Sequence, residues 1–337
     1  MNNYKNILFI NYGGIGDEIL FLPAIKSVVE QYKDAKITLA LEPRAKSISS
    51  LAGYIDEIIT VDIKEKGFKK YINLLKFIFE VRKKRFDCVV SSGKNLFIGI
   101  ILSLLGIKER VGYNSKTGFL LTKKIPLIEN QYAARMYHDL VKPIVEVEYK
   151  NPQIEIIGEF YLDKSLEKEG FICIHPGVSK MSIQKNIFKC PKTPFWINVV
   201  QGLLEKEKKV VLLGANDDET LINEILKNEK IKNNSNFYNY YKKTKSLAEM
   251  AFVMKNASCV ICADSAPLHI ATALGVKTLA IFGPTNEKKL TPDNSSNIEL
   301  ITAQIGCRPC LWNKRICNCE ESKCLDIDPE LILSKIN

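Results

Sequence analysis

Export and membrane-spanning signals are absent from this sequence. Residues Met1–Lys5 are polar, and the apolar run Ile7–Ile10 is too short for the hydrophobic region of a secretory signal. The longest apolar run, Leu96–Ile107, falls well short of the ~20 residues that a membrane-spanning helix needs. We therefore expect a cytoplasmic protein in which Leu96–Ile107 is a buried core helix.

The sequence also lacks a compact basic run interleaved with aromatic residues, so nucleic acid is not an expected partner. Basic residues are nevertheless in excess, and the formal net charge is +10. Residues 1–150 hold 24 Lys and Arg against 16 Asp and Glu, whereas the rest of the chain holds 24 against 22. This imbalance predicts an anionic partner for the first half. A Lys-rich composition inherited from an AT-rich genome is the competing explanation, and it stays open.

Short repeats and low-complexity tracts are missing as well, and 337 residues suffice for two domains. Apolar runs that read as strands alternate with amphipathic stretches that read as helices. The first half has strands at 6–11, 36–41, 58–61 and 88–91 and helices at 17–32 and 69–85, with Pro23 expected to kink or delay the first helix. The second half has strands at 171–175, 209–213, 258–263 and 278–282 and helices at 195–205, 218–226, 246–254 and 267–274.

This alternation predicts an α/β fold with two parallel, doubly wound, Rossmann-like domains. We place the N-terminal domain at 1–150, a linker at 151–170 and the C-terminal domain at 171–337. Two such domains are expected to face each other across a cleft. In open sheets of this kind, ligands bind beyond the carboxyl ends of the strands, so residues that follow strands are the candidates for function.

The segment Gly13-Gly14-Ile15-Gly16-Asp17 follows the first predicted strand. Its glycines let the backbone approach a ligand at a helix start. The third glycine of a dinucleotide-binding fingerprint is missing, which disfavours an oxidoreductase, although the acids of Glu30–Asp34 keep that alternative open. Asp17 can serve as a general base if an acceptor hydroxyl lies within hydrogen-bond reach. A simple helix-capping role is the competing explanation.

Two further segments follow strands of the second half. Asp264-Ser265-Ala266-Pro267-Leu268-His269 opens a helix whose free N–H groups and dipole suit a diphosphate, and His269 lies one turn along. A buried structural role for His269 remains open. His175-Pro176-Gly177-Val178-Ser179 is followed by Lys180, Lys185 and Lys189, and one of these lysines is a suitable partner for a departing diphosphate.

In their order and spacing, these segments resemble the heptosyltransferase family, glycosyltransferase family 9. The resemblance runs over nearly the whole chain. It includes Pro23-Ala24, Arg110-Val111-Gly112-Tyr113, Ile281-Phe282-Gly283-Pro284-Thr285 and a group of C-terminal cysteines in addition to the segments above.

The resemblance implies a GT-B fold and an inverting transfer that requires no metal or other cofactor. It implies a nucleotide-sugar donor, usually ADP-heptose, and an anionic glycolipid acceptor, the inner core of lipopolysaccharide. Asp17 would be the general base. Gly14, Gly16 and Arg110 would lie on the acceptor side. The donor would be bound by Ser179, Lys185 or Lys189, Gly214, Asn216, Asp264, Ser265, Ala266, His269, Gly283 and Pro284.

Three positions depart from the family pattern. Ala266 replaces a glycine, which narrows the backbone approach to the diphosphate. Phe188-Lys189-Cys190-Pro191 stands where a Lys-Arg-Trp-Pro segment is usual, so the phosphate lysine stays ambiguous. Asn216 occupies a position where some members carry an acid that holds the ribose, and it would bind without charge. The reaction type is therefore predicted more firmly than the nucleotide or the sugar.

The C-terminal cysteines have a spacing typical of metal sites. Cys307, Cys310, Cys317 and Cys324 could hold a structural zinc ion as four thiolates, with Cys319 nearby. Reduced, packed thiols are an equal alternative, and disulfides are disfavoured without an export signal. The isolated Cys88, Cys173, Cys259 and Cys262 are expected to be reduced core residues.

Two alternatives concern partners. The basic helix 69–85 suits peripheral contact with an anionic inner-membrane surface, and an ordinary solvated face explains the same charges. The chain could also use another nucleotide sugar or glycan acceptor, or be a catalytically silent sugar-nucleotide-binding subunit.

Overall fold

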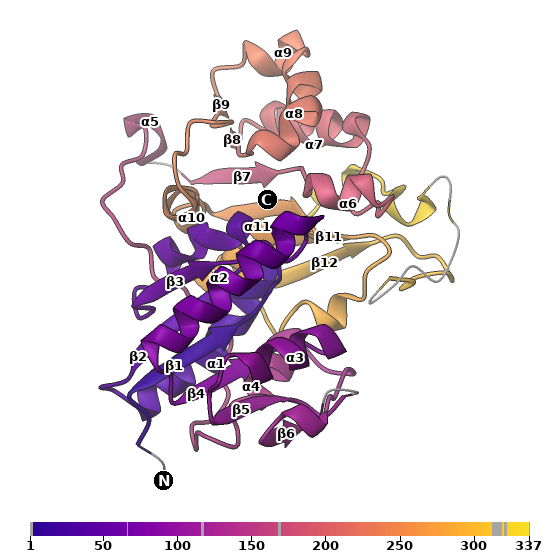
Figure 1. Cartoon of the computed structure of the whole chain (residues 1–337). Helices are drawn as coiled ribbons and strands as arrows, with labels where there is room; N and C mark the ends of the chain where they lie inside the picture. Colours follow the sequence, from indigo (N-terminus) through magenta and orange to yellow (C-terminus); the bar gives the residue numbers. More distant parts are fainter. Residues whose placement is uncertain are drawn as a thin grey trace. The chain divides into compact units, whose positions relative to one another are not determined.

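The protein is described here by a computed structural model that covers residues 3–65, 67–115, 118–167, 170–311, 319 and 322–336. The chain forms two compact units, Met1–Ile157 and Gly158–Asn337 (Figure 1). The division falls within the expected linker 151–170. Each unit contains a parallel sheet of six strands, so the α/β class with two doubly wound sheets is confirmed.

The first sheet has the strand order β3-β2-β1-β4-β5-β6. Its strands are β1 (Asn6–Ile10), β2 (Lys36–Leu41), β3 (Glu57–Thr60), β4 (Cys88–Ser91), β5 (Glu109–Tyr113) and β6 (Lys123–Ile125), and its helices are α1 (Ile15–Gln31), α2 (Phe68–Lys84), α3 (Leu96–Leu104) and α4 (Ala133–Asp139), with short 3₁₀ segments at Pro43–Leu51 and Gly118–Leu120. The chain builds outward from β1 in one direction and then returns to build β4, β5 and β6 in the other. The point of reversal lies between β1 and β4.

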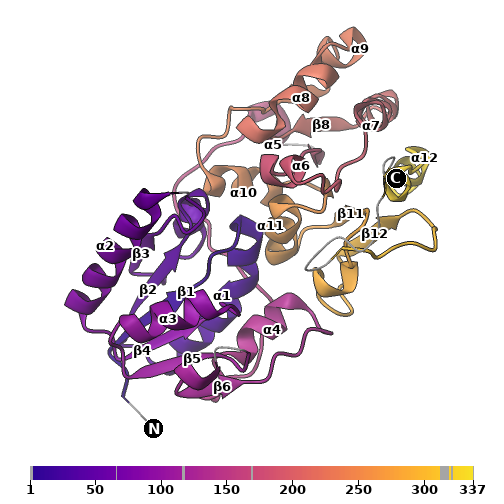
Figure 2. The same ribbon diagram turned by 45° about the vertical axis from the view of Figure 1, so that its right-hand side comes forward.

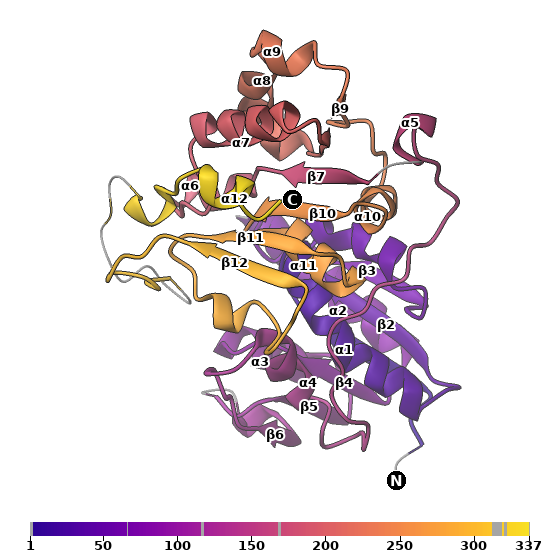
Figure 3. The same ribbon diagram turned by 180° about the vertical axis from the view of Figure 1, so that it is seen from behind.

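Helices cover both faces of this sheet. Alternate residues of β1 point to opposite faces, as they do in any strand. Leu8 and Ile10 share a core with residues of α2 and α3, whereas Phe9 packs edge-on against Phe21 of α1. The helices α1 and α4 contact each other and are seen in front of the sheet in Figure 3.

The second sheet repeats this plan with the order β12-β11-β10-β7-β8-β9. Its strands are β7 (Phe171–His175), β8 (Lys209–Leu212), β9 (Phe237–Asn239), β10 (Cys259–Ala263), β11 (Thr278–Phe282) and β12 (Ile298–Thr302); its helices are α5 (Lys164–Glu167), α6 (Lys180–Gln184), α7 (Thr193–Glu205), α8 (Glu219–Leu226), α9 (Glu229–Lys232), α10 (Leu247–Lys255), α11 (Ala266–Leu274) and α12 (Glu330–Leu333), with 3₁₀ segments at Asn216–Asp218, Glu287–Lys289 and Lys323–Leu325. The reversal lies between β7 and β10. The helices α7, α8 and α12 contribute to one core, which includes the completely buried Trp196 of α7.

Two expectations about helices are wrong in part. The first helix is not delayed by Pro23, because α1 begins at Ile15, directly after the N-cap Gly14, and continues through Pro23 to Gln31. The alternative expectation, a kink at Pro23, stays a prediction. The run Leu96–Ile107 is not a buried core helix on all sides, because Leu96, Ile100 and Leu104 on one side of α3 are exposed. Within the described residues, no helix combines the length and the apolar content needed to cross a membrane. The isolated cysteines Cys88, Cys173, Cys259 and Cys262 are buried and reduced, as expected.

Candidate active site

Asp17 lies in the first turn of α1, at the carboxyl end of β1. The backbone N–H of Gly14 donates a 2.8 Å hydrogen bond to Asp17 Oδ2, so the carboxylate does stabilise the start of the helix. The side chain is exposed all the same. Position 13 must be glycine, because a Cβ atom there would lie only 2.2 Å from the Cβ of Asp17. The loop thus presents one exposed carboxylate over a surface formed by glycine backbone, with Gly16 in the same helical turn.

A second carboxyl group, that of Glu18, is fully buried directly beside Asp17. Burial raises the pKa of Glu18 well above its ordinary value, and the neighbouring Asp17 carboxylate raises it further. Polar contacts with Asn11 and the Gly13 backbone oppose this shift only in part. The raised pKa favours the neutral form of Glu18. Asn11 itself accepts a 2.5 Å hydrogen bond from Ser92, which links the two loops at the reversal point of the sheet.

Arg44 is a residue near this loop that the sequence reasoning missed. Its guanidinium lies beside Gly14, where a Cβ atom would come within 3.4 Å of Nη1. Glu42, which is almost fully buried, holds Arg44 at 2.8 Å and Lys64 at 2.7 Å. The sequence could have indicated Arg44, because Glu42 and Arg44 follow the carboxyl end of β2 just as Gly13 follows β1. Two cations thus share one carboxylate near the glycine loop, which leaves net positive charge there.

Arg110 is not brought to the glycine loop. It lies in the amino-terminal half of β5, where Gly112 rather than Arg110 is level with the end of β1. Its guanidinium donates hydrogen bonds of 2.9 Å to the carbonyl of Leu120 and 2.7 Å to that of Ile107. The observed contacts of Arg110 hold neighbouring turns together.

In the second unit, the loops after β7 and β10 meet at the reversal point. Ser265 Oγ donates a 3.2 Å hydrogen bond to the carbonyl of Gly177. Gly177 must be glycine, because a Cβ atom there would lie 1.7 Å from Oδ1 of the buried Asp218. Asp218 also accepts the Ala215 N–H at 2.8 Å and faces His175 Nε2 at 3.6 Å. Burial lowers the pKa of His175 despite that carboxylate, so we expect neutral imidazole here.

Asp264 is the centre of this site. It is almost fully buried, and its Oδ2 accepts a 2.5 Å hydrogen bond from Thr285 and pairs with Lys189 Nζ at 2.8 Å. Burial alone would raise the pKa of Asp264, but Lys189, Thr285 and the charge of His269 outweigh burial and lower it. One carboxylate thereby joins three loops that are far apart in the sequence. Thr285 stands in a segment that the sequence analysis named, but no role was predicted for its side chain.

The two lysines predicted as candidates for phosphate binding have different environments. Lys189 forms an ion pair with Asp264 at the start of α11, whereas Lys185 is exposed at the carboxyl end of α6. Ser265 is the N-cap of α11, yet its hydroxyl is directed to Gly177 and makes no capping bond. Ala266 and Pro267 form the first turn, and the buried His269 follows one turn later. The amino end of α11 therefore combines its dipole with a held ammonium group, which is an arrangement suited to an anion.

The remaining predicted donor residues have mixed environments. The side chain of Ser179 caps α6 by accepting the Ser182 N–H at 3.4 Å. Gly214 packs against Ile222, and Asn216 is exposed in the 3₁₀ turn after β8. Gly283 and Pro284 precede Thr285, but their carbonyl groups accept hydrogen bonds from Arg308, Cys310 and Leu311. Both residues are thus bound to the cysteine segment.

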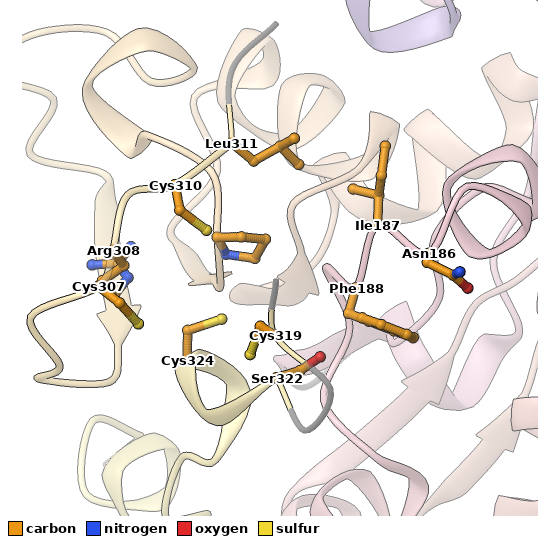
Figure 4. Close-up of a pocket in the computed structure, with 11 residues that line it drawn as sticks. Asn186, Ile187, Phe188, Cys307, Arg308, Cys310, Leu311, Cys319, Ser322 and Cys324 are labelled. Atoms are coloured by element: carbon orange, nitrogen blue, oxygen red, sulfur yellow. The ribbon is translucent and has the colours of Figure 1, made fainter. Parts of the chain in front are cut away.

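Four cysteines line one pocket behind that loop (Figure 4). They are Cys307, Cys310, Cys319 and Cys324, and none of the described cysteines is in a disulfide. The described residues include no group of three or more His, Cys, Asp and Glu side chains that could hold a metal ion. Cys317, one of the four expected zinc ligands, lies outside the described residues, so structural zinc stays a prediction. The pocket also includes Asn186, Ile187 and Phe188, which lead directly to Lys189.

Comparisons with known proteins identify the family of this chain. The sequence profile of glycosyltransferase family 9 (heptosyltransferase) matches residues 74–320. Lipooligosaccharide heptosyltransferase 2 of Campylobacter jejuni is 22% identical over 331 residues, covering 96% of this chain and 95% of its own. Lipopolysaccharide heptosyltransferase 3 of Escherichia coli K12 is 24% identical over 292 residues, covering 80% of each chain.

Solved structures share the fold. ADP-heptose lipopolysaccharide heptosyltransferase II of E. coli superimposes with a TM-score of 0.75 at 19% identity, covering 98% of this chain and 97% of its own. The E. coli heptosyltransferase WaaC with ADP-2-deoxy-2-fluoro heptose gives a TM-score of 0.68 at 16% identity, covering 88% and 93%. The GT-B class expected from the sequence is confirmed. Because the family profile matches well over half of the chain, this protein is an enzyme that belongs to glycosyltransferase family 9, the heptosyltransferase family.

Proposed function

We propose that this glycosyltransferase moves a heptose, or a closely related sugar, from ADP-heptose to the inner core of lipopolysaccharide. The transfer inverts the anomeric centre and uses no metal ion. The observation that carries the proposal is the arrangement at the amino end of α11, where Asp264 holds the ammonium group of Lys189. The sugar and the acceptor class follow those of the E. coli and C. jejuni relatives, which are heptosyltransferases of lipopolysaccharide and lipooligosaccharide.

The donor's diphosphate is assigned to the second unit. An ammonium group has three N–H donors, and Asp264 uses one of them, which leaves two for phosphate oxygens. The N–H groups at the start of α11 add a favourable partial positive charge. Charge that develops on the departing nucleoside diphosphate is therefore stabilised by fixed groups of the protein, without a divalent cation.

Asp17 is assigned as the general base of the first unit. Its observed hydrogen bond uses Oδ2, which leaves Oδ1 to accept the proton of the acceptor hydroxyl. The hydroxyl oxygen attacks the anomeric carbon from the side opposite the diphosphate. The new carbon–oxygen bond forms as the bond to the diphosphate breaks, and the proton passes to Asp17. Arg44 and Lys64 share the single carboxylate of Glu42, so a net positive charge remains to attract an anionic acceptor.

The test is a transfer assay in which ADP-, GDP-, UDP- and CMP-sugars are each offered with purified inner-core acceptor in the presence of EDTA. We expect product only with ADP-heptose, and an inverted anomeric configuration by NMR. Transfer from a different nucleotide sugar, or to a different glycan, would replace the substrates named here. Tight donor binding without transfer to any acceptor would identify a silent binding subunit instead. A requirement for divalent cation would contradict the metal-free mechanism.

A further inference from the structure

The outward side of α2 is covered by large apolar side chains that have no place in the core. Phe68 is 78% exposed, Leu75 is 66% exposed and Phe79 is 74% exposed, and Tyr71 and Ile72 between them are exposed too. At ~100° per residue these five positions form one stripe along the helix. The residues that α2 contributes to the core, Phe77, Ile78 and Val81, lie on a different side. The helix is therefore apolar both toward the sheet and away from it.

The neighbouring helix α3 extends this surface. Leu96, Ile100 and Leu104 are spaced by four residues and are all exposed. The two helices lie side by side and run in the same direction (Figures 1 and 2). Lys70 lies over the ring of Phe97 near their amino ends, and Arg82 donates a 2.8 Å hydrogen bond to the Leu104 carbonyl near their carboxyl ends. Soluble monomers rarely expose so many large apolar side chains together without a binding function.

Basic residues run beside the apolar stripe. Lys69, Lys76 and Lys83 recur every seven residues, which places them in one row along α2 next to Phe68, Leu75 and Phe79. No ion pair joins any of the three lysines to the acidic residues of the described chain. An apolar stripe flanked by lysines is the pattern of a helix that lies in the interface of an anionic membrane.

We propose that the outer surface of α2 and α3, which we call the α2–α3 surface, docks the enzyme on an anionic lipid bilayer. The occupant is a membrane rather than a second protein because the lysine row flanks the apolar residues, and Glu80, the one acid of α2, faces Lys84 at 4.0 Å. Phe68, Leu75 and Phe79 enter the headgroup region while the lysine row contacts the lipid phosphates. The inference rests on the proposed function in one respect, that the acceptor is carried by a lipid.

The experiment is flotation of the full-length enzyme with vesicles of phosphatidylcholine alone or mixed with phosphatidylglycerol. We expect binding only to the mixed vesicles, and loss of that binding at high salt. The triple variant Phe68→Ser/Leu75→Ser/Phe79→Ser should bind at least roughly a hundred-fold more weakly. The variant Lys69→Gln/Lys76→Gln/Lys83→Gln should also lose roughly a hundred-fold and most of its salt dependence.

Matched variants control for surface changes elsewhere. Phe119→Ser/Ile128→Ser/Tyr161→Ser removes three other exposed apolar side chains, and Lys227→Gln/Lys230→Gln/Lys232→Gln removes the same charge from the second unit. Both should float like the unaltered protein. All substituted positions are exposed, and circular dichroism of each variant checks that it is folded.

Three results would overturn the proposal: no flotation of the unaltered enzyme, equal flotation of all variants, or a dimer in sedimentation velocity that only the apolar triple variant dissociates. The last result would make the surface a subunit interface. Transfer to a lipid-free, water-soluble acceptor should be equal in the unaltered enzyme and all variants. Failure of that transfer in the unaltered enzyme would instead defeat the proposed function, and it would leave the vesicle result standing.

Discussion

At the scale of single residues, Asp17 has a capping role that the structure shows and a catalytic role that is proposed. The substitution Asp17→Asn separates them, because an amide oxygen can still accept the Gly14 N–H but cannot take a proton from a hydroxyl. We expect kcat to fall by roughly 10²- to 10⁴-fold while the Kd for donor stays within about two-fold. Steady-state kinetics and calorimetry measure the two quantities. A near-normal kcat would contradict the catalytic role of Asp17 and leave only its role as a helix cap. The variant Asp34→Asn, at another exposed aspartate, is the control.

Lys189 and Lys185 form a natural pair for a second test. Lys189→Ala removes the ammonium group that Asp264 holds, whereas Lys185→Ala removes an exposed one. We expect the affinity for ADP to fall by roughly 10- to 100-fold in the first variant and by less than two-fold in the second. Calorimetric titration with ADP measures both. Equal losses would argue against the selective role of Lys189.

Glu18 should make stability depend on pH. Its pKa in the folded protein is raised well above the ordinary value of 4.5, so the folded state keeps a proton that the unfolded state releases. Stability is therefore lost as the pH rises above about 4.5. Glu18→Gln removes this loss, and we expect its Tm to exceed that of the unaltered protein by a few degrees at pH 8 but not at pH 4. A difference that is the same at both pH values would contradict this account, and Glu148→Gln, at an exposed site, should show no difference.

The sequence predicted site residues that belong to a local pattern, but not contacts between residues that are distant in the chain. Asp264 was predicted because it stands between a buried strand and a helix start, which is a local pattern. The roles of Thr285 and Arg44 were not predicted because they depend on partners that are distant in the chain or in a neighbouring loop. The choice between Lys185 and Lys189 likewise required the position of Asp264 in space.

At the scale of elements, the loop from β7 to α6 depends on Gly177. The substitution Gly177→Ala would place a methyl group 1.7 Å from Asp218 Oδ1, so the loop or the buried carboxylate must move. We expect a loss of about 1–3 kcal/mol in unfolding free energy together with weaker ADP binding. Urea denaturation and calorimetry measure these effects. Gly306→Ala, where a Cβ atom would meet nothing within 4 Å, should be neutral in both assays.

Strands and helices were predicted unequally well. The central strands β1, β4, β7, β10 and β11 stand out because they are continuous apolar runs that the sheet buries on both faces. The strands β5, β6, β9 and β12 were missed. Of these, β6 (Lys123–Ile125) and β9 (Phe237–Asn239) are too short and too polar to show a period. The exposed apolar side of α3 was missed because an apolar run does not reveal which residues face the core.

At the scale of the whole molecule, the two units should respond differently to nucleotide. The site around Asp264 lies within Gly158–Asn337, so ADP should stabilise that unit. At a hundred times its Kd, ADP is expected to raise the unfolding free energy of the unit by about 2.7 kcal/mol. Hydrogen exchange with mass spectrometry should show slower exchange at 176–179 and 264–266 and no change at 11–18. Protection of 11–18 by ADP alone would contradict the assignment of the donor to the second unit.

The pairing of Lys189 with Asp264 has a consequence for turnover. Because the chain supplies its own counter-ion, the ammonium group stays neutralised between reaction cycles. If the diphosphate binds here as proposed, it would compete with a carboxylate that is already in place, and the net electrostatic gain on binding would be smaller than for a lone cation. The same carboxylate would then favour departure of the spent nucleotide. The proposed site thus predicts lower product affinity together with faster product release.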